Sequence, residues 1–184
     1  MKDIVFLCGY SRTGKSSIAQ MLYKKYGYNI IKIDAIINAV NQLLDNKIDK
    51  HNYDDRVKTI IVSLIKNFWS DIKNRGYKYV FDTCSINVQT ANELKDLLMQ
   101  FNFDIIFLIN TAQVDNIMAK IRKTEKPYDW TKQIDDNKLY EFCKNCQRES
   151  KEIKLECEKL KIKYIDVCDS DLLDLFEKVE KIIK

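Results

Sequence analysis

Glycine and proline are scarce in this sequence, whose 184 residues include four glycines and one proline. Neither residue gathers into a linker, and we find no internal repeat and no low-complexity tract. A chain of this length can build one good hydrophobic core but not two large domains. We therefore expect a single domain over residues 1–184.

Long hydrophobic runs are also missing. No apolar run approaches the ~20 residues that a membrane-spanning helix needs, and no signal-peptide pattern precedes the first apolar segment. We therefore expect a cytoplasmic protein without a membrane partner. In that reducing setting the six cysteines are expected to be free thiols.

The net charge is small, because the sequence has 31 basic and 27 acidic residues. Only five of the basic residues are arginine. No basic stripe with interleaved aromatic residues is present, so we expect no nucleic-acid partner and disfavour a polynucleotide kinase. The only histidine, His51, has no serine or cysteine partner in its context and is expected at the surface.

Short apolar runs of strand length recur along the chain and alternate with helical patterns. The runs cover residues 4–8, 28–33, 77–81, 105–109 and 164–167. Helical spacing of apolar residues follows each run, most clearly from Tyr53 to Ile72 and from Leu139 to Leu160. This alternation predicts an α/β fold with a parallel sheet and right-handed crossovers.

The segment Gly9-Tyr10-Ser11-Arg12-Thr13-Gly14-Lys15-Ser16 matches the phosphate-loop pattern G-x-x-x-x-G-K-[ST], with a predicted strand before it and a predicted helix after it. Its glycines let backbone N–H groups turn inward, and the helix N-terminus favours negative charge. Lys15 is expected at the β- and γ-phosphates, and Ser16 at Mg²⁺. The expected nucleotide-binding residues are Gly9, Ser11, Arg12, Thr13, Gly14, Lys15, Ser16 and Ser17.

A GTPase is disfavoured, although Asn46-Lys47-Ile48-Asp49 resembles a guanine-recognition motif. That motif lies too soon after the phosphate loop and no D-x-x-G is present, so we interpret Asn46–Asp49 as a solvated turn. A motor or a large oligomeric ATPase would need further subdomains, for which the chain has no room.

The chain resembles the small P-loop kinases, which are nucleoside monophosphate kinase-like and shikimate kinase-like. The segments "SRTGKSS", "KIDAI", "PYDWT" and "YIDV" are similar to those of uncharacterised bacterial kinase-like ATP-binding proteins. The resemblance implies a three-layer α/β/α sandwich with a five-stranded parallel sheet in the order 2-3-1-4-5. It also implies an acceptor-binding region at about residues 34–75 and a lid at about residues 120–137.

The same resemblance assigns roles to residues outside the loop. Asp34 is expected to orient or deprotonate the acceptor hydroxyl, although it could instead cap a helix over 35–44. Asp82 is expected to contact Mg²⁺ through water or Ser16, with capping of the next helix as the alternative. Arg122 is expected to neutralise the charge on the transferred group.

Arg56, at the start of the long helix in the acceptor region, would suit an anionic acceptor, and Arg148 is expected to join in substrate binding from the far side of the lid. Arg75, just before a glycine, is more typical of a helix C-terminus. Cys143 and Cys146 have the spacing of a zinc pair, but a second pair is missing, and both fall on the apolar face of a helix. We expect them to pack in the core.

We therefore predict an ATP- and Mg²⁺-dependent kinase that acts on a small-molecule acceptor, as a monomer or a homodimer. One alternative is a nucleoside monophosphate kinase proper, although those enzymes have more lid arginines. The other is a nucleotide-binding regulatory protein with little turnover. The acceptor itself is not predicted by the sequence.

Overall fold

The computed structural model describes residues 1–43 and 53–184. A five-stranded parallel sheet forms its centre, in the order β2-β3-β1-β4-β5. This confirms the predicted fold and strand order. The strands are β1 (Ile4–Cys8), β2 (Tyr28–Lys32), β3 (Lys78–Asp82), β4 (Phe103–Ile109) and β5 (Lys163–Asp166).

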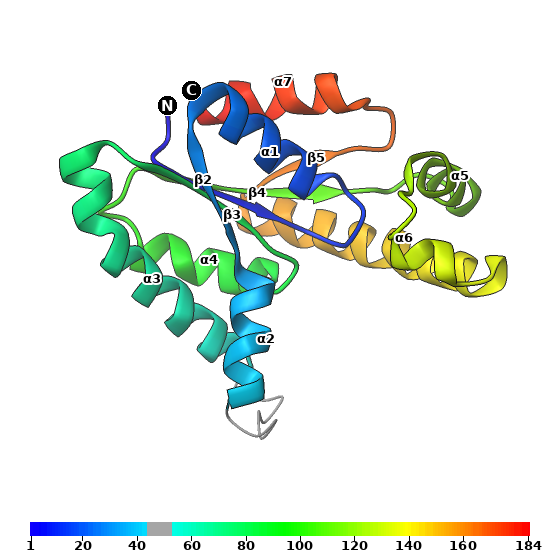
Figure 1. Ribbon diagram of the computed structural model, residues 1–184, viewed down its shortest axis with the longest axis horizontal. Coiled ribbons are helices and arrows are strands. Elements are labelled where there is room, and N and C mark those ends of the chain that lie inside the picture. Colours follow the sequence, from blue (N-terminus) through cyan, green and yellow to red (C-terminus); the bar gives the residue numbers. More distant parts are fainter. Residues whose placement is uncertain (44–52) are drawn as a thin grey trace.

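Helices cover both faces of the sheet and give the three layers that Figure 1 shows. Helices α1 and α7 lie on one face, and α3, α4 and α6 lie on the other. The helices are α1 (Lys15–Tyr26), α2 (Ile33–Leu43), α3 (Tyr53–Arg75), α4 (Val88–Leu97), α5 (Val114–Thr124), η2 (Trp130–Gln133), α6 (Asp136–Leu160) and α7 (Leu172–Ile183).

The central strand β1 shows why the sheet needs both layers. Its side chains alternate, so Ile4 and Phe6 enter the core beneath α3 and α4, whereas Val5 and Leu7 enter the core beneath α1 and α7. All four side chains are buried. A strand that is buried on both faces must be apolar throughout, which is why this run is continuous rather than alternating.

Some element boundaries differ from those expected. The helix after β2 begins at Ile33, so Asp34 lies in its first turn rather than before it. Asn87, not Asp82, caps α4 by accepting a hydrogen bond from the Thr90 N–H. The predicted turn Asn46–Asp49 and His51 lie outside the described residues. Within 1–43 and 53–184, no helix has the length and hydropathy needed to cross a bilayer.

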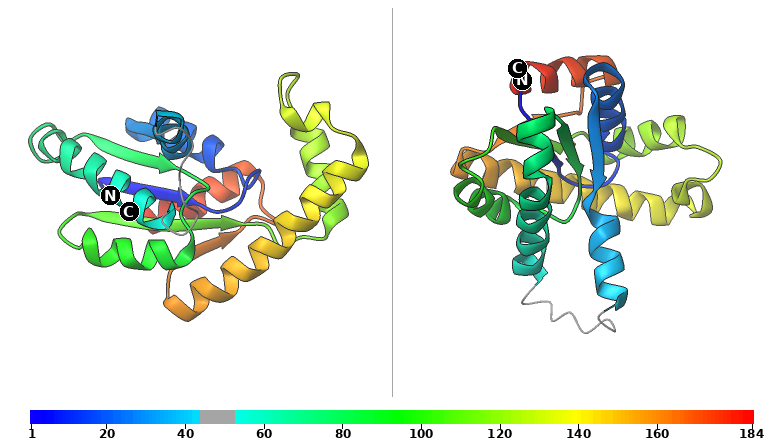
Figure 2. Two further views of the ribbon diagram at one scale, coloured as in Figure 1. Left: turned by 90° about the horizontal axis from the view of Figure 1, so that it is seen from below. Right: turned by 60° about the vertical axis from the view of Figure 1, so that its left-hand side comes forward.

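Helix α5, η2 and the first turns of α6 form an arm beyond the end of the sheet, at the position of the predicted lid (Figure 2). We call residues 114–139 the lid. It packs around a small apolar core of Ile117, Ile121 and Leu139, to which Cys143 in the next turn of α6 also belongs. This core makes the lid a defined substructure rather than an irregular loop.

Candidate functional site

The phosphate loop leaves β1 in a conformation that its glycines make possible. Gly9 and Gly14 have φ angles of 114° and 92°, and Arg12 between them has a φ of 65°. A Cβ atom at Gly9 would lie 2.2 Å from the backbone oxygen of Leu108 on β4. The loop therefore needs glycine at position 9 both for its dihedral angle and for its close approach to β4.

Two side chains of the loop motif meet oxygen partners at the start of α1. The buried Lys15 Nζ donates to the backbone oxygens of Gly9 and Tyr10 at 2.8 and 2.6 Å. The Ser16 hydroxyl donates to Asp82 Oδ2 at 2.6 Å. The carboxyl end of β3 thus reaches the phosphate loop, as the predicted partnership of Ser16 and Asp82 requires.

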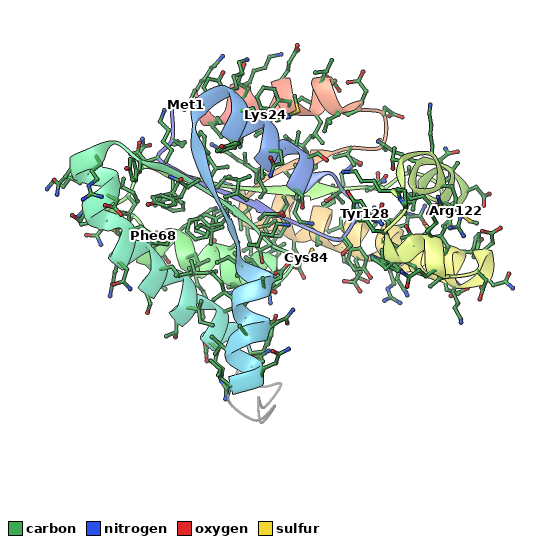
Figure 3. The ribbon with its side chains drawn as sticks, in the orientation of Figure 1. Met1, Lys24, Phe68, Cys84, Arg122 and Tyr128 are labelled. Atoms are coloured by element: carbon green, nitrogen blue, oxygen red, sulfur yellow. The ribbon has the colours of Figure 1, made fainter. Side chains whose placement is uncertain are left out.

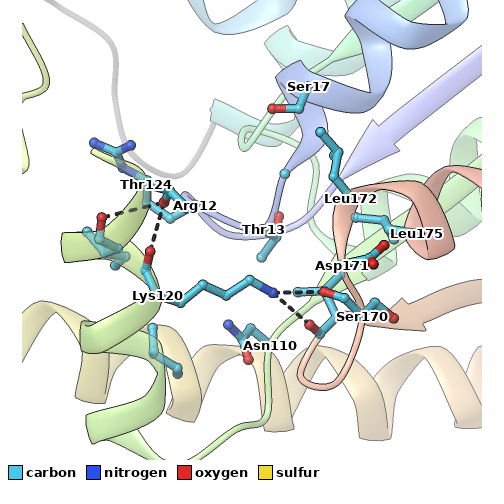
Figure 4. A pocket seen from close by; sticks show the side chains of 14 residues that line it. Arg12, Thr13, Ser17, Asn110, Lys120, Thr124, Ser170, Asp171, Leu172 and Leu175 are labelled. Carbon is cyan, nitrogen blue, oxygen red and sulfur yellow. Dashed lines mark hydrogen bonds between the residues drawn. The ribbon is translucent and has the colours of Figure 1, made fainter. Parts of the chain in front are cut away.

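One cavity of about 190 Å³ opens beside the loop, between the lid and the turn that follows β5. We call it the lid-side cavity (Figure 4). Apolar groups from α5 and α7 form much of its wall, and the loop forms its floor. Its lining includes Arg12, Thr13, Gly14, Ser17, Asn110, Ile117, Lys120, Ile121, Val167, Ser170, Asp171 and Leu175.

Lys120 crosses this cavity, and our sequence reasoning did not single it out. Its Nζ donates to the backbone oxygens of Val167 and Ser170 at 3.2 and 3.0 Å. Figure 4 shows the side chain extending from α5 to the turn after β5. Its sequence signal was weak, because it belongs to a lid rich in lysine, where a solvated side chain is the ordinary expectation.

A second cavity, of about 460 Å³, lies on the opposite side of the loop, and we call it the sheet-edge cavity. The loop contributes Gly9 and Tyr10, the turn after β3 contributes Cys84 and Ser85, and α3 and α6 supply the remaining walls. Its lining is Gly9, Tyr10, Tyr53, Asp54, Cys84, Ser85, Ile86, Asn87, Val88, Glu149, Glu152, Ile153 and Glu156.

Asp34 lies behind this cavity and holds its β3 wall in place. Its Oδ1 accepts hydrogen bonds from Thr83 Oγ1 and Ser85 Oγ, both at 2.7 Å, and its Oδ2 accepts one from the Cys84 N–H at 2.9 Å. The Tyr53 hydroxyl donates to Ser85 Oγ at 3.0 Å. A chain of hydrogen bonds therefore connects the cavity lining to the Asp34 carboxylate.

The family follows from a comparison with family models. A model described as an AAA domain (AAA_33) matches residues 4–148, which is most of the chain. The chain belongs to this family. The matched range includes the phosphate loop, both aspartates that follow strands, and the lid. None of the curated proteins gives a match to this sequence.

Solved P-loop kinases have the same fold as this member of the family. The gluconokinase from Sinorhizobium meliloti 1021 aligns with a TM-score of 0.59 at 12% identity, covering 99% of this chain and 91% of that one. Shikimate kinase from Bacteroides thetaiotaomicron gives 0.59 at 13%, covering 99% and 97%. Thymidylate kinase from Candida albicans gives 0.53 at 18%, covering 99% and 91%. The resemblance to small P-loop kinases is confirmed.

Within this P-loop kinase fold, Arg122 forms its hydrogen bonds with other residues of the lid. Its Nη1 donates to the Thr131 backbone oxygen at 2.8 Å, and its Nη2 donates to Asp136 Oδ1 at 2.6 Å. Further bonds reach Glu125 and the backbone oxygen of Ile134. Figure 3 shows the residue out in the lid, well apart from Cys84 at the sheet edge. Contact with the transferred group stays a prediction, because these bonds direct the guanidinium into the lid.

Arg12 connects the loop to the lid. Its Nη1 donates to Asp129 Oδ2 at 3.1 Å, and its Nη2 donates to Thr131 Oγ1 at 3.0 Å. The arginine and the Lys126 N–H together lower the pKa of Asp129, with the backbone bond making the larger contribution. Asp129 therefore stays ionised and keeps the lid against the loop. Phosphate binding by Arg12 stays a prediction.

The predicted acceptor arginines lie outside both cavity linings. Arg56 Nη1 is buried and has no hydrogen-bond partner among the described residues. Arg148 is exposed on α6 and pairs with Glu149 at 3.2 Å. Arg75 pairs with Asp71 at 3.3 Å, one turn back on α3, near the helix end where it was expected. Acceptor binding by Arg56 and Arg148 stays a prediction.

Cys143 and Cys146 are buried on α6, as packing in the core requires. Cys143 belongs to the apolar core of the lid. Burial raises the pKa of the Cys146 thiol to about 12, so that thiol remains protonated near neutral pH. Among the described residues no group of three or more metal-ligating side chains comes together.

Proposed function

We propose that this protein is an ATP- and Mg²⁺-dependent kinase that phosphorylates a hydroxyl group of a small molecule. One observation supports this most directly: two cavities flank a single phosphate loop, and each takes part of its lining from that loop. A transferase that joins two substrates needs such an arrangement, because the donor and the acceptor must approach one phosphorus atom from opposite sides.

The lid-side cavity suits the nucleoside of ATP. It is lined by apolar groups and by a few placed polar groups, as nucleotide pockets commonly are. The triphosphate would then lie along the loop, where α1 presents its N-terminal amides and Lys15 supplies an ammonium group. The cavity lining includes Arg12, Thr13 and Gly14 of the loop and Ser17 of α1. A nucleoside in the cavity can therefore be joined directly to phosphates that lie along the loop.

Residues at the start of α1 and at the end of β3 fit a magnesium ion. The Ser16 hydroxyl and the Asp82 carboxylate lie 2.6 Å apart, and both are the oxygen donors that Mg²⁺ prefers. Ser16 would hold the ion directly, and Asp82 would hold it through water. When bound, the ion offsets negative charge on the phosphate oxygens. The chain's own contribution is to keep these two oxygens together beside the loop.

The acceptor would occupy the sheet-edge cavity with its hydroxyl toward the loop. Its oxygen forms a bond to the γ-phosphorus while the bond from that phosphorus to the β–γ bridging oxygen breaks, and ADP leaves. The hydroxyl proton passes to Ser85, which lines the cavity, and Ser85 passes its own proton to Asp34. Asp34 thereby acts as the base through a neighbour rather than by direct contact.

An ADP-release assay over a panel of hydroxy compounds and nucleoside monophosphates tests the proposal. Acceptor-dependent release should fall on the order of a hundredfold or more in Lys15→Met, because the variant loses the ammonium group at the transferred phosphate. Lys24→Met, on the exposed side of α1, should retain it. If ATP binds and no acceptor raises release, the regulatory alternative holds. A preference for monophosphates would favour a nucleoside monophosphate kinase.

A further inference from the structure

The part of the sheet-edge cavity lining that α6 contributes is acidic. Helix α6 contributes Glu149, Glu152 and Glu156, whose spacing of three and four residues places them on one face of the helix. Asp54 at the start of α3 adds a fourth carboxylate. No lysine, arginine or histidine is among the described residues that line this cavity.

Neighbouring cations neutralise this wall only in part. Arg148 lies 3.2 Å from Glu149 and 4.0 Å from Glu152, but 63% of its side chain is exposed, so solvent screens both pairs. The Asp54 carboxylate accepts a hydrogen bond from the neutral amide of Asn87 at 2.9 Å. Glu156 forms no ion pair with any described residue. Carboxylates therefore outnumber cations among the described residues at this wall, although solvent also screens the exposed Glu152 and Glu156.

A cation outside the lining, Lys15, bonds to the loop residues of the cavity, where the phosphates would bind. Lys15 donates to the backbone oxygens of Gly9 and Tyr10, and both residues also line the cavity. Tyr10 and Tyr53 are also among the lining residues, and aromatic side chains favour a cation over an anion. The charged groups around the cavity therefore include the Lys15 ammonium bonded to the loop and the carboxylates that α3 and α6 contribute to the lining.

From this charge distribution we infer that the acceptor is a cationic hydroxy compound, of the amino-alcohol or amino-sugar class. The inference rests on the proposed kinase function. The position of the acceptor comes from the cavity beside the loop, and the carboxylates indicate only the charge of the acceptor. The hydroxyl faces Ser85 and the loop, and an ammonium group faces Glu152 and Glu156. The amine keeps its protons, and only the hydroxyl oxygen accepts the phosphoryl group.

This assignment replaces the anionic acceptor that Arg56 and Arg148 had suggested. An anion in this cavity would be repelled by the carboxylates of α6, and neither arginine lines the cavity to offset that repulsion. It also disfavours a nucleoside monophosphate, because a phosphate group carries nearly two negative charges at neutral pH. The cavity of about 460 Å³ is large enough for a compound of sugar size.

Three open-chain six-carbon polyols that differ mainly in charge test the inference: glucamine, sorbitol and gluconate. Their affinities are measured by ligand-observed NMR with Mg²⁺ and a non-hydrolysable ATP analogue present, and turnover by ADP release. Glucamine should bind about tenfold or more tightly than gluconate, and this preference should weaken as salt screens the carboxylates. Gluconate binding as tightly as glucamine, or no detectable glucamine binding, would overturn the inference.

Charge-removing variants locate the effect. In Glu152→Gln/Glu156→Gln the preference for glucamine should fall roughly fivefold or more, whereas Glu141→Gln, on α6 but outside the cavity lining, should keep it. Unchanged selectivity in the double variant, with unfolding temperature preserved, contradicts the inference. ATP affinity is measured in a separate titration. If ATP does not bind, the proposed function is wrong. If ATP binds normally and gluconate is preferred, only this inference is wrong.

Discussion

Gly9 shows how one residue sets the geometry of the phosphate loop. Its backbone lies against the carbonyl of Leu108 on the neighbouring strand, and its φ of 114° is outside the range that other residues readily adopt. Both constraints arise where the loop turns away from β1. The loop's position relative to β4 therefore depends on the absence of a side chain at this one residue.

Replacing Gly9 with alanine should destabilise the protein by roughly 2–3 kcal/mol, because the new Cβ would clash with backbone and the dihedral angle would be strained. Denaturant unfolding measures the change in the free energy of unfolding. Gly27→Ala is the matched control, since Gly27 also has a positive φ but has no atom within 4 Å of an added Cβ. Equal losses in the two variants would show that the close approach to Leu108 is unimportant.

At the scale of elements, the lid is held together by polar contacts around Arg122 and by its small apolar core. The guanidinium donates hydrogen bonds to oxygens between the end of α5 and the start of α6. A planar group with five donors can satisfy such a set, and an ammonium group cannot do so with the same geometry. The lid's shape therefore depends on arginine rather than on positive charge alone.

Arg122→Lys should increase amide hydrogen exchange about tenfold in the segment 125–135, because most of these bonds would be lost. The KM for ATP should rise with it. Exchange measured by mass spectrometry, beside steady-state kinetics, tests this, with Arg75→Lys on α3 as the control. A large fall in kcat without faster exchange would instead favour the direct role at the transferred group that the family resemblance implies.

At the scale of the whole molecule, the two ends of the chain come together and close the structure. The Lys2 N–H donates to the Ile183 backbone oxygen at 2.8 Å, and Figure 2 shows the termini side by side. Nearby, Glu180 on α7 accepts hydrogen bonds from Lys184, Lys25 and Tyr26, which connects α7 to α1. These bonds lower the pKa of Glu180 to about 2 from 4.5.

A carboxylate whose pKa is lowered by folding stabilises the protein above its unfolded pKa and loses that effect as pH falls through its folded pKa. Glu180→Gln should therefore lower the unfolding temperature by up to roughly 3 °C at neutral pH, as expected for a partly exposed ion pair. The difference should disappear between about pH 4.5 and 2. Glu177→Gln, exposed on the same helix, is the control, and a pH-independent difference would contradict the assignment.

The sequence alone predicted the alternation of strands and helices, the phosphate loop and the places of Asp34 and Asp82, because these depend on patterns local to the chain. The strand order came from the resemblance to small P-loop kinases, since no local pattern determines which strands pair. An apolar run followed by G-x-x-x-x-G-K-S determines a strand, a turn and a helix start. Each expected strand is present, with its ends displaced by at most two residues. The amphipathic spacing of α6 likewise predicted that Cys143 and Cys146 are buried.

Tertiary structure decided what each charged residue faces. Arg122, Arg12 and Lys120 are alike in sequence, as basic residues in or near a loop. In the structure Arg122 bonds to other residues of the lid, Arg12 joins the phosphate loop to the lid, and Lys120 bonds to the turn after β5. The acidic wall of the sheet-edge cavity joins residues of α3 and α6 that are far apart along the chain. Backbone conformation follows from nearby residues, whereas the field in a cavity follows from which distant side chains folding brings together.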